Sequence, residues 1–169
     1  MSTDVIEIRQ IQEQDIGGFY DTFSTVVKER RYLAFLEPPP IDQTRAFVRR
    51  NIECSVPHLV AIDDRKLVGW CDVTPIGQDV LSHVGVLGIA IHPDWRDQGL
   101  GARMLRSALD AAWEFGNLRV ELGVFSHNPR ARALYRKLGF VEEGVRRRRV
   151  LIDGEFHDEI MMAVMPDEP

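Results

Sequence analysis

The 169-residue sequence is poor in cysteine: only Cys54 and Cys71 occur, so at most one disulfide could form. Neither cysteine belongs to a CxxC pair or has a cluster of histidines beside it, which excludes the common zinc and redox motifs. We expect both to be reduced, partly buried thiols, and we expect no bound metal.

Long apolar runs are also missing. No stretch of about 18 apolar residues occurs, which a membrane-spanning helix would need. Residues 1–9 alternate polar and apolar side chains and lack the apolar centre of a signal peptide. These absences predict a chain that does not insert into a membrane, and they favour the cytoplasm as its location.

Positive charge is scarce as well. The formal net charge is -5 and the sequence pI about 5.5, which argues against a general nucleic-acid binder. The exception is the run Arg146–Arg149. On a strand its members would alternate between the two sides, and four acidic residues follow within ten positions. We expect a solvated, salt-bridged strand pair; the alternative is that one or two of these arginines bind an acceptor carboxylate.

Against these absences stands an ordinary globular composition. Hydrophobic residues make up 44% and charged residues 28% of the chain. The length suits one domain with a single core, and no internal repeat or linker interrupts it apart from Pro38–Pro40. We therefore expect one domain over residues 1–169.

Hydrophobic periodicity predicts the elements of the first half. Alternation favours a strand over 5–11, and helical spacing favours helices beginning after Asp15 and after Asp42, each aspartate acting as an N-cap. Two β-rich runs around a polar turn at 63–66 then predict a hairpin over 58–74.

The second half alternates strands and helices. Strands are expected over 81–91, 118–125, 140–145, 148–152 and 157–164, and helices over 99–115 and 129–138. This order predicts an α/β fold with a mixed sheet and helices on both faces.

The most informative segment joins the strand over 81–91 to the helix over 99–115. It reads RDQGLG over 96–101. A helix start carries unpaired N–H groups and partial positive charge, and glycines let the backbone approach a bulky anion. Arg96 could add a charged hydrogen bond. These features predict a pyrophosphate cradle. A Walker loop is excluded by the missing GK[ST], and the dinucleotide fingerprint fails because Met104 stands at the third glycine position.

The pattern R-x-x-G-x-G after a strand ending in HPDW resembles the acetyl-CoA loop of the GNAT N-acetyltransferase superfamily. A second hallmark, NPRARALYRKLGF over 128–140, follows at the distance that the family shows. The resemblance covers about residues 85–162. The tail over 142–163 is similar to groups that acetylate free amino acids, protein N-termini or small amine antibiotics.

This resemblance implies the GNAT fold, with a mixed, mostly antiparallel sheet and a central splay, and acetyl-CoA as cosubstrate. The acetyl group would pass directly to a primary amine of a small molecule or amino acid, and a homodimer is a family-based expectation. The residues expected to hold the coenzyme are Ile89, Ala90, Ile91, Arg96, Asp97, Gln98, Gly99, Leu100, Gly101, Ala102, Asn128, Arg130 and Tyr135.

Within that set, the resemblance gives individual residues distinct roles. The Ile89 N–H would hold the acetyl oxygen, and Asn128 would bind the pantetheine arm and cap its helix. Asp97 is ill suited to an anion site, so its side chain should turn outward or cap the helix.

For catalysis the resemblance points to Tyr135 as the general acid that protonates the departing thiolate, since a phenol is protonated at neutral pH. Glu121 is our first choice for the base that deprotonates the amine. His83, Asp72 and Glu37 are alternatives, as is a chain of water molecules.

Three other functions remain open from the sequence. The acceptor could be a protein N-terminal amine, which an open groove would favour over a closed pocket. The chain could also be a CoA-binding module without catalysis, or a Rossmann-type nucleotide binder.

Overall fold

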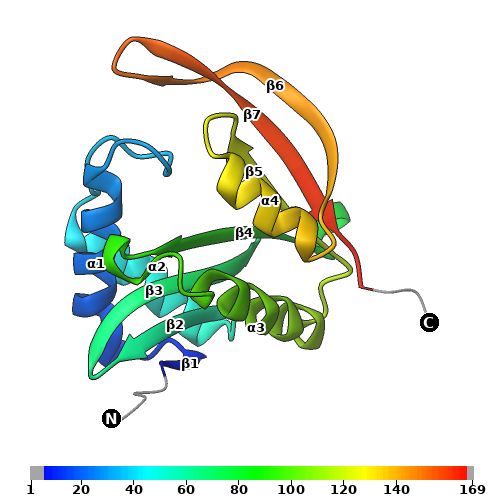
Figure 1. Cartoon of the computed structure of the whole chain (residues 1–169). Coiled ribbons are helices and arrows are strands. Elements are labelled where there is room, and N and C mark those ends of the chain that lie inside the picture. The colour runs from blue at the N-terminus through cyan, green and yellow to red at the C-terminus, as the bar shows by residue number, and fades with distance from the viewer. Residues whose placement is uncertain (1–5, 167–169) are drawn as a thin grey trace.

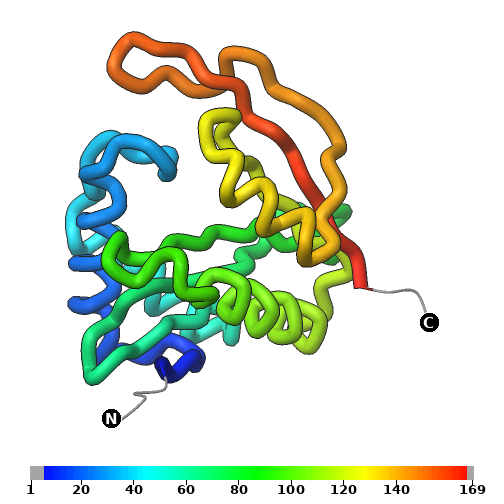
Figure 2. The backbone as a smooth tube through the Cα atoms, viewed as in Figure 1, coloured from blue at the N-terminus to red at the C-terminus, as the bar shows by residue number. Residues whose placement is uncertain are grey.

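The computed structural model describes residues 6–166 of the chain (Figures 1 and 2). In this range seven strands form one sheet in the order β1-β2-β3-β4-β5-β7-β6. The strands are β1 (Glu7–Gln10), β2 (His58–Asp63), β3 (Lys66–Pro75), β4 (Val84–Ile91), β5 (Arg119–Phe125), β6 (Val141–Ile152) and β7 (Glu155–Val164). The helices are α1 (Ile16–Lys28), α2 (Ile41–Glu53), α3 (Leu100–Phe115) and α4 (Pro129–Lys137).

The sheet is antiparallel except where β4 meets β5. These two strands run parallel and pair only over Val84–Val86 with Arg119–Glu121. Beyond Val86 they separate, while β4 stays paired with β3 and β5 with β7. The expected mixed, mostly antiparallel sheet with a central splay is therefore confirmed.

Helices cover both faces of the sheet, as the sequence predicts (Figure 1). Alternation along β3 shows why. Val68 and Val73 pack in one cluster with α3 and α4, whereas Leu67 and Trp70 pack in a second cluster with α1 and α2. Successive side chains of a strand point to opposite faces, and an irregularity in the pairing of β2 with β3 at Ala61–Ile62 shifts this alternation by one residue at Val68. A strand with apolar residues at nearly every position therefore supplies two cores.

Four predicted strands have different limits in the structure. The first is shorter, and Val5 lies outside the described residues. The strand predicted from Leu81 begins at Val84, because Asp79–Leu81 forms a 3-10 turn. The two strands predicted over 140–152 are one strand, β6, which keeps its pairing with β7 through irregularities at 142–144 and 146–150.

Asp15 stands at the N-cap position of α1, as predicted, but its side chain makes no capping hydrogen bond there, and Asp42 is not at the N-cap position of α2. Asp15 ends a 3-10 turn before α1, where its carboxylate accepts from the Gln12 N–H and pairs with Arg9 at 2.6 Å. Asp42 lies inside the first turn of α2 and pairs with Arg45 instead. A carboxylate within the first turn still favours the helix through its dipole.

The hairpin of β6 and β7 extends past α4, and its tip lies above the loop that follows α1 (Figures 1 and 2). An ion pair joins these two segments: the Arg30 guanidinium donates to both carboxylate oxygens of Asp153, at 3.2 and 2.5 Å. The hairpin tip and the loop between α1 and α2 are thus fastened together across the splayed side of the sheet. None of the helices in residues 6–166 is long and apolar enough to cross a membrane.

Candidate active site

The loop before α3 has the geometry of an anion site. Gly99 precedes the helix at φ 77°, a left-handed conformation that glycine adopts without strain. No side chain caps this helix end, so the N–H groups of its first turn are available to a ligand. Gly101 lets α4 approach closely, because a β-carbon there would lie 3.3 Å from Leu134.

A cavity of about 640 Å³ begins at this loop. It follows β4 beyond its pairing with β5, passes α4, and reaches β7 and the loop after α1. Residues of the loop after α1, of β4, of the glycine loop, of β5, of α4 and of β7 line it. They include Tyr32, Gly88, Ile89, Ala90, Ile91, Arg96, Asp97, Gly99, Leu100, Gly101, Ala102, Gly123, Asn128, Arg130, Tyr135 and Glu159. One cavity therefore joins most of the residues that the sequence proposes for binding a coenzyme.

The β4 backbone faces this cavity with alternate N–H groups. The His92 N–H donates to Val68 on β3 at 2.8 Å. Because N–H directions alternate along a strand, the Ile89 and Ile91 N–H groups point toward the splay and the Ala90 N–H points to β3. Ile89 is thus placed to donate to a ligand as expected, whereas Ala90 offers contact but no free N–H.

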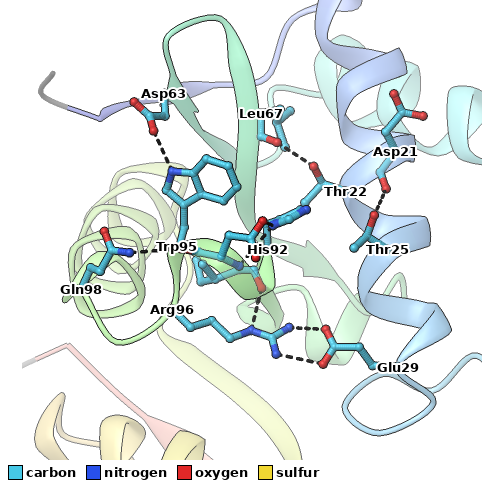
Figure 3. A network of polar contacts seen from close by, with 12 residues as sticks. Asp21, Thr22, Thr25, Glu29, Asp63, Leu67, His92, Trp95, Arg96 and Gln98 are labelled. Carbon is cyan, nitrogen blue, oxygen red and sulfur yellow. Dashed lines mark hydrogen bonds and ion pairs between the residues drawn. The ribbon is translucent and has the colours of Figure 1, made fainter.

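Arg96 differs from expectation, since its side chain turns toward α1 (Figure 3). The guanidinium donates to both Glu29 oxygens, at 2.9 and 2.5 Å, and its Nε donates to the Ile91 carbonyl at 2.9 Å. This commits three of its N–H groups to the protein. The predicted charged hydrogen bond from Arg96 to a diphosphate is therefore not supported; Arg96 joins the loop to α1 and the end of β4.

Asp97 and Gln98 point out of the loop. Asp97 is 74% exposed on its side chain and pairs with Arg130 on α4 at 2.7 Å. This agrees with the expected outward orientation and ties the loop to the start of α4. The Gln98 side chain is exposed and donates to the Asp94 carbonyl, so it does not line the cavity.

Tyr135 and Asn128 lie on α4 and at its start. Tyr135 is 8% exposed, lines the cavity, and has no hydrogen-bond partner among residues 6–166. Burial raises its pKa, so the phenol keeps its proton. The Asn128 side chain accepts from the Ala131 N–H at 3.2 Å, which makes it the N-cap of α4.

Glu121 is not where a base is needed. It lies on β5 where β4 and β5 are still paired, contacts Arg119 at 3.0 Å, and does not line the cavity. Two residues further along β5, beyond the splay, stands Gly123, and the carboxylate of Glu159 from β7 fills the space beside it. Sequence reasoning missed Glu159; a glycine inside a β-rich run was the available signal.

The comparisons with known proteins agree with this geometry. The model of the acetyltransferase (GNAT) family matches residues 23–140. The chain belongs to this family. It is 30% identical over 109 residues to the L-amino acid N-acetyltransferase AaaT of Escherichia coli, covering 64% of this chain and 67% of that protein. It is 31% identical over 162 residues to a Bacillus subtilis protein provisionally named ribosomal protein bS18-alanine N-acetyltransferase, covering 95% and 96%.

Solved structures show the same fold. A GNAT acetyltransferase of Streptococcus pneumoniae superposes with a TM-score of 0.89 at 25% identity, covering 96% of this chain and all (100%) of that one. A GNAT phosphinothricin acetyltransferase of Sinorhizobium meliloti, solved with acetyl-CoA, has a TM-score of 0.89 at 18% identity and covers 95% and 88%. The GNAT fold and the N-acetyltransferase class expected from the sequence are confirmed.

The other acidic and basic candidates of this GNAT protein differ in position. His83 precedes β4 and is exposed, and its carbonyl accepts from the Leu118 N–H. Glu37 is 79% exposed beside Arg30. Neither lines the cavity. Asp72 lies on β3, paired with Gly88 on β4.

The two cysteines are free, as expected, but they are not alike. Cys54 is exposed at the end of α2, contrary to the expected partial burial, and Cys71 is buried in β3. Burial raises the pKa of the Cys71 thiol well above its usual value, and neither cysteine lines the cavity. Residues 6–166 contain no group of three or more potential metal ligands.

Proposed function

We propose that this protein transfers the acetyl group of acetyl-CoA directly to the primary amine of a small molecule, a free amino acid being the best candidate. One observation carries the proposal: a single cavity runs from the glycine loop before α3, past Tyr135, to the carboxylate of Glu159. Donor and acceptor can therefore meet within one cavity at the splay.

The donor side suits a coenzyme diphosphate and a thioester. The first turn of α3 offers free N–H groups and the positive end of the helix dipole, and Gly99 and Gly101 leave room for a bulky anion. The Ile89 N–H would donate to the thioester oxygen as negative charge builds there, which is where such a donor contributes most to rate.

Tyr135 is the proton donor of the proposed reaction. When the amine nitrogen bonds to the acetyl carbon, the carbon–sulfur bond breaks and the sulfur takes a proton from the phenol. Its high pKa keeps Tyr135 protonated until then. The same buried surroundings also disfavour a free thiolate, so the sulfur retains enough proton affinity to take this proton.

Direct transfer is supported by the positions of the nucleophiles. An acyl-enzyme would need an activated cysteine or a similar group in the cavity. Cys71 is buried as a thiol in β3, and Cys54 lies at the end of α2. Both are away from the cavity lining.

The acceptor side combines charges of both signs. The Glu159 side chain is 17% exposed and lies 3.2 Å from Arg146 and 3.6 Å from Arg149. Its carboxylate can hold an ammonium group. The two arginines lie outside the cavity lining, beside Glu159, and can pair with the carboxylate of a molecule whose ammonium group is held there. A free amino acid carries both groups. This agrees with the alternative reading of the arginine run, that part of it binds the acceptor.

The segments around the acceptor end of the cavity are joined by polar contacts, which favours a small substrate. Arg30 pairs with Asp153, and the His127 Nε2 lies 2.6 Å from the Arg31 carbonyl. These contacts join the loop after α1 to β7's hairpin and to the start of α4. A peptide would have to pass between segments that are tied together, whereas an amino acid would not.

A protein N-terminal amine is the second candidate. It is favoured by the relative in Bacillus subtilis, whose name gives ribosomal protein bS18-alanine as its acceptor and which aligns with 95% of this chain. An N-terminal residue presents an ammonium group to Glu159 but has no free carboxylate for the arginines.

The test is a screen for acetyl transfer, read by release of free thiol and by mass of the product. Amino acids, their amides, polyamines and short peptides are compared at equal concentration. We expect amino acids to exceed their amides, because the amides lack the carboxylate. Tyr135→Phe should lower kcat on the order of 100-fold and leave acetyl-CoA binding unchanged. Preference for peptides over all small amines would replace the proposal by the second candidate.

A further inference from the structure

Asp72 is a buried carboxyl group with no partner. It lies in the middle of β3, opposite His58 on β2 and Gly88 on β4, and is 8% exposed. Within residues 6–166 its carboxyl group forms no side-chain hydrogen bond or ion pair, and its oxygens are not among the fully enclosed polar atoms, so solvent still reaches them. A carboxyl group in such a position lowers the stability of the fold, and we therefore ask whether it takes part in the reaction.

The carboxylate lies beside Gly88, a residue of the cavity lining, although Asp72 itself is not part of that lining. Gly88 lines the cavity and has no side chain; a β-carbon built on it would be 3.4 Å from Oδ2 and 3.5 Å from Oδ1 of Asp72. The Gly88 position is also where β4 has just left β5, so that it borders the splay. Asp72 thus neighbours, through Gly88, the part of the cavity where the proposed function brings donor and acceptor together.

The surroundings of Asp72 tune its proton affinity. Burial raises its pKa to about 7, and no charged side chain contributes to this rise. The titratable groups beside it are uncharged at neutral pH: burial lowers the pKa of His58 to about 4 and raises that of the Cys71 thiol. On the face of the sheet covered by α1, the aromatic rings of Phe19 and Phe23 pack on Trp70, which lies two residues before Asp72 on β3.

The two carboxylates near the splay are therefore in contrasting environments. Glu159 on β7 has two arginines beside it, at 3.2 and 3.6 Å, and its carboxylate can hold an ammonium group. Asp72 on β3 has no cation beside it. In enzymes, two acidic groups in such different environments commonly have different roles: one binds the substrate and the other transfers a proton.

We propose that Asp72 is the base that takes the proton from the acceptor amine before it attacks acetyl-CoA. This rests on the proposed function. The ammonium group gives one proton to the Asp72 carboxylate and becomes a neutral amine. Its lone pair forms the bond to the acetyl carbon, the carbon–sulfur bond breaks, and Tyr135 protonates the sulfur. The second amine proton restores Tyr135, and Asp72 releases its proton to solvent.

The main test is Asp72→Asn, which keeps shape and removes the base. With a strongly basic amine, kcat should fall on the order of 100-fold or more. The wild type should lose rate below about pH 7, and this loss should be absent in the variant. A weakly basic acceptor, hydroxylamine for instance, is neutral at pH 7 and needs no base, so the variant should acetylate it nearly as fast as wild type. Stabilisation by acetyl-CoA in thermal unfolding should be unchanged.

A second variant acts without touching Asp72. Gly88→Ala places a methyl group in ordinary contact with the carboxylate and between it and the cavity. It should lower kcat for the strongly basic amine more than for hydroxylamine. Glu121→Gln is the matched control, because it neutralises a carboxylate outside the cavity lining and should keep wild-type rates.

The outcomes separate the two proposals. Wild-type kcat in Asp72→Asn with the strongly basic amine, or an equal loss with both acceptors, overturns the role of Asp72 while acetyl transfer by the wild type stands. A wild-type protein that acetylates no amine overturns both.

Discussion

The carboxylate of Glu159 occupies the space that a side chain on Gly123 would need. The two residues lie on neighbouring strands beyond the splay, and both line the cavity. The absence of a side chain on β5 thus lets a carboxylate from β7 reach the acceptor side. A substitution at Gly123 can therefore displace the Glu159 carboxylate while Glu159 itself is unchanged.

Gly123→Ala should weaken acceptor binding. The added methyl group has to displace the Glu159 carboxylate, the far end of a flexible side chain, so the fold can adapt. Loss of a charged hydrogen bond costs about 1.5–3 kcal/mol, and we therefore expect KM for the amine to rise about tenfold or more. Steady-state kinetics with the amine varied would measure it. Gly144→Ala on β6, where the added atom meets open space, is the control; equal KM values in the two variants would contradict the role of Glu159.

Gly99→Ala should weaken acetyl-CoA binding. Gly99 has a positive φ of 77° and lines the cavity at the start of α3. Gly116 ends the same helix at φ 106° and is outside the cavity lining. Each alanine substitution should cost on the order of 1 kcal/mol of stability, from the same backbone strain. Only Gly99→Ala should also raise the dissociation constant of CoA in calorimetry, and a similar rise in Gly116→Ala would show that helix stability alone is responsible.

Local patterns predicted the cradle and missed the contacts around it. RDQGLG and the NPRARALY segment lie within continuous runs, so spacing along the chain locates the glycine loop and Tyr135 correctly. Arg96 and Glu29 are 67 positions apart and meet only through folding, so no local signal shows that Arg96 is already paired. The sequence points to Glu121 and gives no comparable sign of Glu159, because it does not reveal where β5 leaves β4, and that point decides which acidic residue reaches the cavity.

Glu29→Gln should destabilise the protein through Arg96. The pair is two-thirds or more buried, with 20% and 25% of the side chains exposed, and has two short hydrogen bonds. Removing the charge should lower the free energy of unfolding by about 1–2 kcal/mol, or Tm by about 3–6 °C. Glu13→Gln is the matched control, because its pair with Arg49 is more than half exposed and solvent screening should leave it little effect on stability. Equal Tm shifts in the two variants would mean that the Arg96 pair is as weak as a surface pair.

Asp72→Asn should stabilise the protein, and more so at higher pH. In the unfolded chain this carboxyl group loses its proton near pH 3.8, whereas in the folded protein burial raises its pKa to about 7. Between these values the folded state holds a proton that the unfolded state has lost, so the free energy of unfolding of the wild type falls as pH rises. The slope is about 1.4 kcal/mol per pH unit and ends above pH 7. Asparagine carries no such proton, so the variant's advantage over wild type should grow from pH 4 to pH 7 and then stay constant. Urea unfolding at several pH values measures this difference. A difference that does not change with pH would mean that Asp72 is solvated in the folded protein. A variant that is more stable but inactive would show that the protein keeps Asp72 for the reaction at the expense of stability.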